Sequence, residues 1–145
     1  MRPEPRKRSD YLHFHTISTR WMDNDAYGHV NNVVYYSWFD TVVNRFLVAG
    51  GVLDIERSAS IGLVIETQCH YFASVAFPDR VTAGLRVATL GNTSVRYEVG
   101  IFREDEDMPA AQGHFVHVYV DRETRRPSPI PPGTRSLLET IKVQS

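Results

Sequence analysis

The stretch from Asn31 to Gly51 reads NNVVYYSWFDTVVNRFLVAGG and contains the clearest structural pattern of the chain. Its bulky apolar side chains recur every three or four positions, which is the pattern of an α-helix with one wide apolar face. Gly50 and Gly51 predict the end of this helix. We therefore expect a helix over residues 31–49, roughly 28 Å long, whose apolar face lies against a sheet. The polar side chains gather on the other face, at Ser37, Thr41, Asn44 and Arg45.

Five other stretches show the alternation of apolar and polar residues that is typical of β-strands. They cover residues 11–21, 63–72, 80–90, 94–103 and 110–120. Turn-forming residues separate the last four stretches, which is typical of antiparallel hairpins. One antiparallel five-stranded sheet wrapped around one long central helix is the simplest arrangement of these elements. The predicted fold class is therefore α+β, in a single domain over residues 1–145.

The two ends of the chain have a different composition from the middle. Residues 1–10 contain four basic residues and two prolines, and we expect a flexible basic tail there. Residues 128–145 begin with a proline-rich segment, and Thr134 is a candidate N-cap for a short C-terminal helix that ends near Ile141.

Composition and charge exclude several classes of protein. The 145 residues include 16 basic and 17 acidic ones, so the net charge of -1 provides no field for nucleic acid or an anionic membrane. No apolar run is long enough to span a bilayer, and a single cysteine, Cys69, excludes an internal disulfide. His13 and His15 share a strand face but have no partner at a metal-ligand spacing. We expect a cytoplasmic protein with no metal site and no nucleic-acid or membrane partner.

The polar loop before the long helix, RWMDNDAYGHVNN over residues 20–32, contains the strongest chemical signal. The first N–H groups of a helix have no intrahelical partner and lie at the positive end of its dipole, so they can polarise a carbonyl. Asp23 and Asp25 precede this helix end, and Gly28 permits a sharp turn. A thioester is an activated acyl group, which one carboxylate and one polarising helix end can hydrolyse without a metal or a cofactor.

This loop resembles the signature of hotdog-fold thioesterases of the 4-hydroxybenzoyl-CoA thioesterase-like branch. The resemblance continues in residues 62–66, 77–79 and 118–121, and it covers about residues 11–132 in the same order of elements. The matching positions of the signature are Arg20, Trp21, Asp23, Asp25, Gly28, His29, Val30, Asn31, Asn32 and Tyr35.

The resemblance implies an acyl-CoA thioesterase of the hotdog fold with no cofactor. It also implies a homodimer or homotetramer with active sites at the subunit interface. The catalytic carboxylate of the family corresponds to Asp25, and its carbonyl-polarising amides correspond to the region of residues 30–32. The predicted substrate-binding residues are Tyr27, Gly28, His29, Val30, Asn31 and Asn32.

Other acidic residues offer alternatives to Asp25. One family variant has its carboxylate on the central helix, where Asp40 is the only acid. Asp40 lies about 15 residues past Asp25, roughly four helical turns, which is too far to share a carbonyl with the helix N-terminus. Asp23 either pairs with Arg20 and loop amides or acts as a second acid. The loop also resembles the start of a calcium site, but position twelve of such a site would be Val34, so we reject it.

Several neighbouring side chains have two interpretations. His29 either orients the substrate or a water, or holds the loop against the first strand. One of Asn31 and Asn32 is expected to cap the helix, which leaves the other to contact ligand. Tyr35 is expected in the core.

Three functions remain open at the level of sequence. The first is hydrolysis of an acyl-CoA thioester to CoA and a carboxylic acid, with Asp25 as base or nucleophile. The second is a non-catalytic acyl-CoA binding or sensing module, and the third is hydrolysis of thioesters on an acyl carrier protein. Arg122, Arg125 and Arg126 form a basic turn that is either solvated or in contact with the phosphates of coenzyme A.

Overall fold

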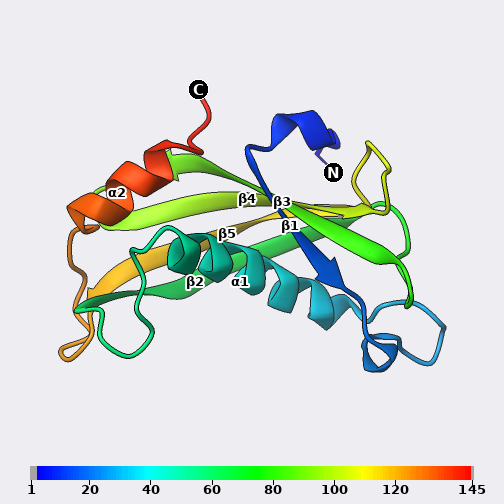
Figure 1. Cartoon of the computed structure of the whole chain (residues 1–145), viewed down its shortest axis with the longest axis horizontal. Helices are drawn as coiled ribbons and strands as arrows, with labels where there is room; N and C mark the ends of the chain where they lie inside the picture. Colours follow the sequence, from blue (N-terminus) through cyan, green and yellow to red (C-terminus); the bar gives the residue numbers. More distant parts are fainter. Residues whose placement is uncertain (1–2, 145) are drawn as a thin grey trace.

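The computed structural model describes residues 3–144 and contains one antiparallel sheet of five strands in the order β1-β3-β4-β5-β2 (Figure 1). The sequence-based prediction of an α+β fold with one five-stranded sheet and one long helix is confirmed. The strands are β1 (His13–Ser18), β2 (Ser60–Tyr71), β3 (Arg80–Leu90), β4 (Ser94–Arg103) and β5 (Ala111–Asp121). The α-helices are α1 (Asn32–Ala49) and α2 (Pro132–Glu139), and short 3-10 turns are η1 (Arg8–Asp10) and η2 (Trp21–Asp23).

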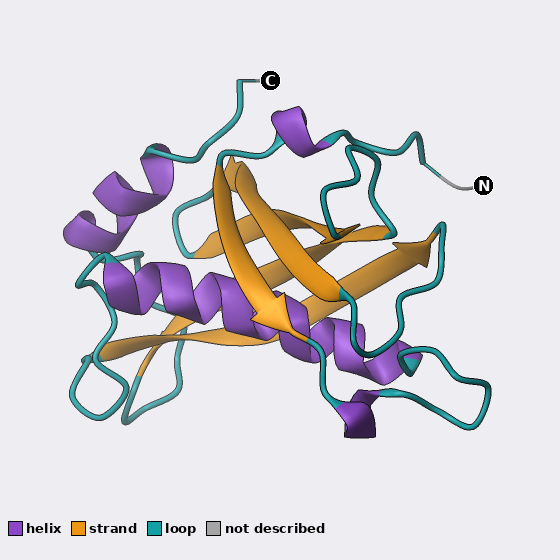
Figure 2. Ribbon diagram, turned by 45° about the vertical axis from the view of Figure 1, so that its right-hand side comes forward, coloured by secondary structure: helices purple, strands orange, loops and turns teal. Residues whose placement is uncertain are grey.

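Helix α1 lies across one face of the sheet, which we call the inner face (Figure 2). Its apolar stripe is buried, and Phe39, Val42 and Val43 are fully shielded from solvent. Phe39 packs edge-on against Phe115 of β5, with 6.5 Å between the ring centroids. Because strand side chains alternate between faces, every second residue of the central strands lies on the inner face, in the same core as α1. Those residues include Leu85, Val87, Val95, Tyr97, Val99 and Ile101.

Three elements have boundaries that differ from the predicted ones by more than one residue. Strand β1 is shorter, since Tyr11 turns its ring onto the other face of the sheet and Trp21 begins η2. Strand β2 begins earlier, at Ser60, and has an irregularity between Val64 and Glu66. Helix α2 begins at Pro132, because proline suits the first helical turn, where its missing N–H costs nothing.

Residues 3–10, which we expected to be a flexible basic tail, make ordered contacts with the outer face of the sheet. The Arg6 N–H donates to the buried Gln112 side chain at 2.7 Å, and Arg8 Nη2 donates to the Glu104 and Glu106 carbonyls. The Tyr11 ring reaches the sheet through gaps left by Gly84 and Gly100, where a Cβ would lie within 3 Å of that ring. The basic residues are held because acceptors of the sheet and its turns face them, which composition alone does not reveal.

None of the helices within residues 3–144 is both long and apolar enough to cross a membrane.

Candidate active site

The loop between η2 and α1 closes on itself through backbone hydrogen bonds. The Asp25 N–H donates to the His29 carbonyl at 2.9 Å, and the Gly28 N–H donates to the Asp25 carbonyl at 3.1 Å. Gly28 has a φ of +84°, a conformation that glycine adopts without steric cost. The turn fixes the position of Asp25 relative to the helix that follows.

Asp23 has a structural role in this loop. Its side chain is only 1% exposed and accepts hydrogen bonds from the Arg20 backbone N–H and from the Arg20 guanidinium, at 2.8 to 3.0 Å. Its backbone carbonyl accepts the Asn31 N–H at 2.9 Å. The predicted pairing of Asp23 with Arg20 is confirmed, and both carboxylate oxygens of Asp23 are occupied by it.

The backbone amides at the start of α1 are not equivalent. The Val30 N–H donates to the Val75 carbonyl at 2.7 Å, and the Asn31 N–H is occupied by Asp23. The Asn31 side chain caps the helix by accepting the Val33 N–H at 3.1 Å, as expected for one of the two asparagines. Among residues 3–144, no acceptor faces the Asn32 N–H, the first of the helix. Of the amides over residues 30–32, only that of Asn32 is available to a ligand.

Asp25 and Asn32 belong to the lining of one cavity of about 230 Å³. The cavity lies between the loop, the first turn of α1 and the segment after β2. Its lining consists of Asp25, His29, Val30, Asn32, Tyr35, Tyr71, Ala73, Ser74 and Val75. An acidic residue and the residue whose unpaired amide stands at the positive end of the α1 dipole thus line the same space.

The structure brings together half of the residues predicted to bind substrate. His29, Val30 and Asn32 line the cavity, whereas Tyr27 is 85% exposed and stacks against the His29 ring at 6.5 Å between centroids. Gly28 acts through its backbone, which forms the turn, and Asn31 acts through its side chain, which caps α1.

Besides Tyr35, which was expected in the core, four lining residues were not singled out from the sequence as cavity residues. Tyr71 ends β2, and Ala73, Ser74 and Val75 follow it. The Val75 carbonyl holds the Val30 N–H, so this segment is attached to the loop although about 45 positions separate them. The only local sequence signal for this segment was the end of a strand followed by a short run of small residues. Strand alternation by itself does not show which end of α1 this segment contacts.

Hydrogen bonds define the orientation of the Asp25 carboxylate. Its Oδ1 accepts the Tyr27 N–H at 2.8 Å, and its Oδ2 lies 3.9 Å from His29 Nδ1. Oδ1 is therefore anchored by the turn, and Oδ2 is the oxygen with freedom to act on a ligand.

Two tyrosines form the wall opposite Asp25. The Tyr71 hydroxyl donates to the Asn32 carbonyl at 3.2 Å, and the Tyr71 and Tyr35 rings meet edge-on at 5.0 Å between centroids. Burial raises the pKa of Tyr35 to about 12. Burial and the neighbouring Cys69 raise the pKa of Tyr71 above its usual range. Both phenols are thus neutral near pH 7 and can donate hydrogen bonds but cannot act as bases.

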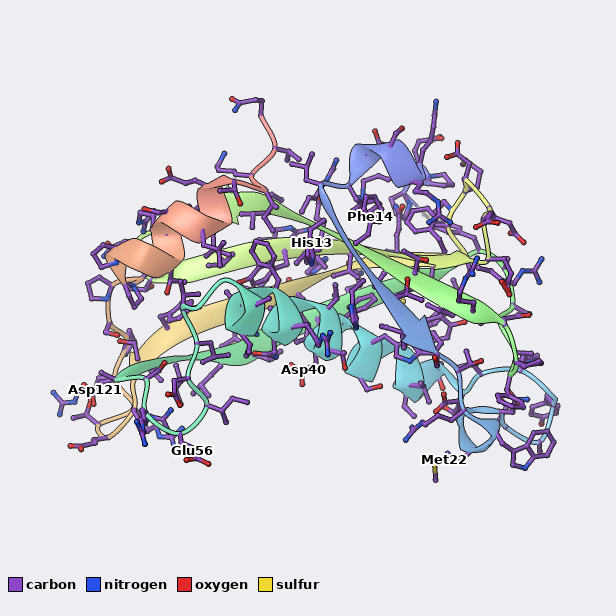
Figure 3. The ribbon with its side chains drawn as sticks, in the orientation of Figure 1. His13, Phe14, Met22, Asp40, Glu56 and Asp121 are labelled. Atoms are coloured by element: carbon purple, nitrogen blue, oxygen red, sulfur yellow. The ribbon has the colours of Figure 1, made fainter. Side chains whose placement is uncertain are left out.

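Asp40 lies apart from this cavity. It points from α1 away from the sheet (Figure 3), and its carboxylate accepts a hydrogen bond from Asn44 Nδ2 at 3.0 Å. Asp40 lies eight positions after Asn32, the first residue of α1, and is therefore away from the N-terminus of that helix.

The model of the Thioesterase-like superfamily matches residues 19–138 of the chain. The PA5185 protein from Pseudomonas aeruginosa strain PAO1 has a similar crystal structure, with 52% sequence identity and a TM-score of 0.94 over 97% of this chain and 99% of that one. The PA2801 protein, a putative thioesterase from Pseudomonas aeruginosa, is 28% identical with a TM-score of 0.80 over 87% and 97% of the two chains. The BH1999 gentisyl-coenzyme A thioesterase shares the fold, at 23% identity and a TM-score of 0.77 over 87% and 99%.

Proposed function

Since the chain belongs to the Thioesterase-like superfamily and is a thioester hydrolase of the hotdog fold, we propose that it hydrolyses acyl-CoA thioesters with Asp25 as the catalytic carboxylate. The observation that supports this assignment is that Asp25 and Asn32, whose backbone N–H has no acceptor among residues 3–144, line one cavity. The membership of the 4-hydroxybenzoyl-CoA thioesterase-like branch stays a prediction.

In the proposed reaction, the thioester carbonyl oxygen accepts a hydrogen bond from the Asn32 N–H. The amide lies at the N-terminus of α1, where the helix dipole favours the negative charge that develops on this oxygen as a nucleophile adds. The amide is fixed by the cap and by the Val30 and Asn31 backbone bonds, so it needs no rearrangement during the reaction.

Asp25 Oδ2 can act in either of two ways. As a general base it removes a proton from a water that attacks the carbonyl, and the C–S bond breaks with the thiolate leaving. As a nucleophile it forms a mixed anhydride and releases the thiolate, and water then cleaves the anhydride to the free acid. In both routes the products are a carboxylic acid and the thiol of coenzyme A.

We also propose that a second copy of the chain pairs along β2 and completes the site at the subunit interface. Strand β2 is an edge of the sheet, and Leu63, Val64 and Ile65 on it are 37%, 45% and 64% exposed. A long apolar edge strand is a template for pairing with another chain. Whether such dimers pair further into a tetramer is a separate question that light scattering answers.

Antiparallel pairing of two β2 strands would bring opposite ends of the strands together. The Tyr71 end, beside the Asp25 cavity, would then lie near the Ser60 end of the second copy. That end adjoins the basic turn of Arg122, Arg125 and Arg126, since the Arg122 guanidinium donates to the Ser58 and Ile55 carbonyls. Guanidinium groups are suited to phosphates, which supports coenzyme A as the carrier of the acyl group. The gentisyl-coenzyme A thioesterase that shares the fold is named for such a substrate.

A thiol-release assay tests the proposal. Short, long and aromatic acyl-CoAs are mixed with the enzyme, and free thiol is measured in single-turnover and steady-state experiments. Asp25→Asn and Asp25→Ala are expected to lower kcat by roughly 10²- to 10⁴-fold, the usual contribution of a general base. Asp40→Asn is the matched control, because Asp40 is an acid of the same type that lies on α1 outside the Asp25 cavity, and it is expected to keep near-normal turnover.

Near-normal turnover of both Asp25 variants would refute the assignment of this residue. A much higher kcat/KM for acyl carrier protein thioesters than for acyl-CoA would leave the assignment of Asp25 unchanged. It would show that the acyl carrier is the carrier protein and not coenzyme A. Failure to release thiol from either carrier would favour the alternative of a non-catalytic acyl-CoA binding module over the proposed substrate.

A further inference from the structure

The face of the sheet that α1 does not cover, the outer face, contains a second cavity of about 410 Å³. It shares no lining residue with the Asp25 cavity, and strand β2 separates the two. Gln68 and His70 project into the outer cavity, whereas Tyr71 faces the inner one. The lining consists of Pro3, Arg6, Gln68, His70, Arg96, Glu98, Gln112, Gly113 and His114.

Two hydrogen-bond acceptors of this cavity, the side chains of Glu98 and Gln112, are already occupied. Glu98 accepts from Arg86 Nε at 2.7 Å and lies 3.7 Å from Arg6 Nη1. The buried Gln112 accepts the Arg6 N–H at 2.7 Å and donates to the Glu4 carbonyl at 3.0 Å. The ordered N-terminal segment thus forms one wall and satisfies the polar groups beneath it.

The guanidinium of Arg96 is in a different situation. Its Nη2 lies 3.2 Å from His114 Nδ1, and His114 Nε2 lies 2.6 Å from Glu66 Oε2. A guanidinium only donates hydrogen bonds, so Nδ1 must accept, and the ring proton is on Nε2, from which it is donated to Glu66. Arg96 therefore has a neutral imidazole as its partner. Within residues 3–144, no carboxylate lies within 4.0 Å of Arg96, and its Nε and Nη1 have no hydrogen-bond partner.

We propose that the outer cavity binds a small organic molecule through an oxyanion group, a carboxylate or a phosphate, held by Arg96. The free hydrogen-bonding capacity at Arg96 is that of a donor, and a guanidinium binds planar oxyanions through paired hydrogen bonds. The volume of the cavity exceeds what a bare inorganic anion fills and lies within the range of small-molecule sites. The His114–Glu66 pair fixes the position of one edge of the guanidinium before the ligand arrives. The site is independent of the proposed hydrolysis.

Calorimetric titration of the full chain tests this site with three probes. Benzoate and phenyl phosphate share a ring and differ in the oxyanion, and inorganic phosphate has no organic body. We expect 1:1 binding of benzoate or phenyl phosphate, with inorganic phosphate weaker than either. Arg96→Gln is expected to weaken binding roughly 10- to 100-fold, the usual contribution of hydrogen bonds to charged groups.

Two controls locate the binding. Arg45→Gln removes an exposed arginine from α1, on the other side of the sheet, and Asp25→Asn changes the inner cavity. Both are expected to bind the probe with unchanged affinity. Binding that survives in Arg96→Gln, or that is altered in Asp25→Asn, would place the probe elsewhere and overturn the proposal, as would no binding of any probe at millimolar concentration.

A second variant keeps the test decisive if Arg96→Gln does not fold. Gln68→Trp changes an exposed side chain at the mouth of the cavity and leaves every charge in place. It is expected to weaken probe binding at least tenfold through obstruction while the circular dichroism spectrum stays that of the parent. Unchanged affinity in folded Gln68→Trp would contradict the proposal.

Discussion

The inner and outer faces of the sheet are built from the same strands, yet they present opposite chemistry. On the inner face, one carboxylate, Asp25, meets the electropositive end of α1 in a cavity of about 230 Å³. On the outer face, Arg96, whose only hydrogen-bond partner among residues 3–144 is a neutral imidazole, lines a cavity of about 410 Å³. The two cavities adjoin the same end of β2, at His70 and Tyr71. Strand alternation determines which side chains lie on each face. The chemistry of each cavity also depends on the element packed over that face, which is the N-terminus of α1 on the inner face and the basic N-terminal segment on the outer face.

The largest expected effect concerns the packing on the inner face. Phe39→Ala removes a fully buried ring between α1 and β5 and is expected to lower the free energy of unfolding by about 3 to 5 kcal/mol. Phe14→Ala on the outer face, where the ring is 39% exposed, is expected to cost about 1 to 2 kcal/mol. Urea unfolding measures both, and equal losses would show that the faces do not differ in burial as described.

The next effect separates the Asn32 amide from the Asn32 side chain. Asn32→Pro removes the N–H together with the side chain at the first helical position, where proline is tolerated. Asn31 already has the extended ψ of 138° that a following proline requires. We expect kcat to fall by roughly 10²- to 10³-fold, as for loss of one oxyanion donor. Asn32→Ala keeps the amide and is the control. Comparable kcat values for the two variants would exclude the amide from the reaction.

A pH effect of similar size is expected from His117, which lies on the inner face. Its Nδ1 has no hydrogen-bond partner among the described residues, and burial lowers its pKa to about 4. The unfolded chain, with a histidine pKa of about 6.5, takes up the proton first as the pH falls. Stability is therefore full above about pH 6.5 and decreases between about pH 6.5 and 4, by up to about 3 kcal/mol.

Urea unfolding at a series of pH values measures this dependence. His117→Leu is expected to be less pH-dependent over the same window, because the group that takes up the proton is absent. His13 and His15, whose pKa values are also lowered by burial, add a residual slope of the same sign. A slope in His117→Leu equal to that of the parent would contradict the assignment.

The smallest effect concerns the shared end of β2. Tyr71→Phe removes the hydrogen bond from the Tyr71 hydroxyl to the Asn32 carbonyl and is expected to cost about 0.5 to 1.5 kcal/mol of stability. Tyr36→Phe, a half-exposed tyrosine on α1, is the matched control. A larger loss in the control would mean that the 3.2 Å contact at Tyr71 contributes nothing.

Much of the architecture could be predicted from local sequence. The 3.6-residue period over residues 31–49 predicted α1, and the two-residue period predicted five strands, because each element must bury one side of its surface. The asparagine cap and the pairing of Asp23 with Arg20 were also predictable, since both depend on residues within three positions of each other. The order of the strands in the sheet was not, because register depends on partners far apart in the chain.

The sequence by itself determined the α+β fold class and the candidate role of Asp25, because short-range periodicity and a contiguous motif encode them. Only the tertiary structure decided which amide near Asp25 is unpaired. The carbonyl of Val75, 45 positions away, accepts the Val30 N–H, and the carbonyl of Asp23 accepts the Asn31 N–H. It also decided that the N-terminal segment packs on the outer face and that Arg96 faces a cavity there. Both outcomes depend on long-range contacts, whose partners no local pattern specifies.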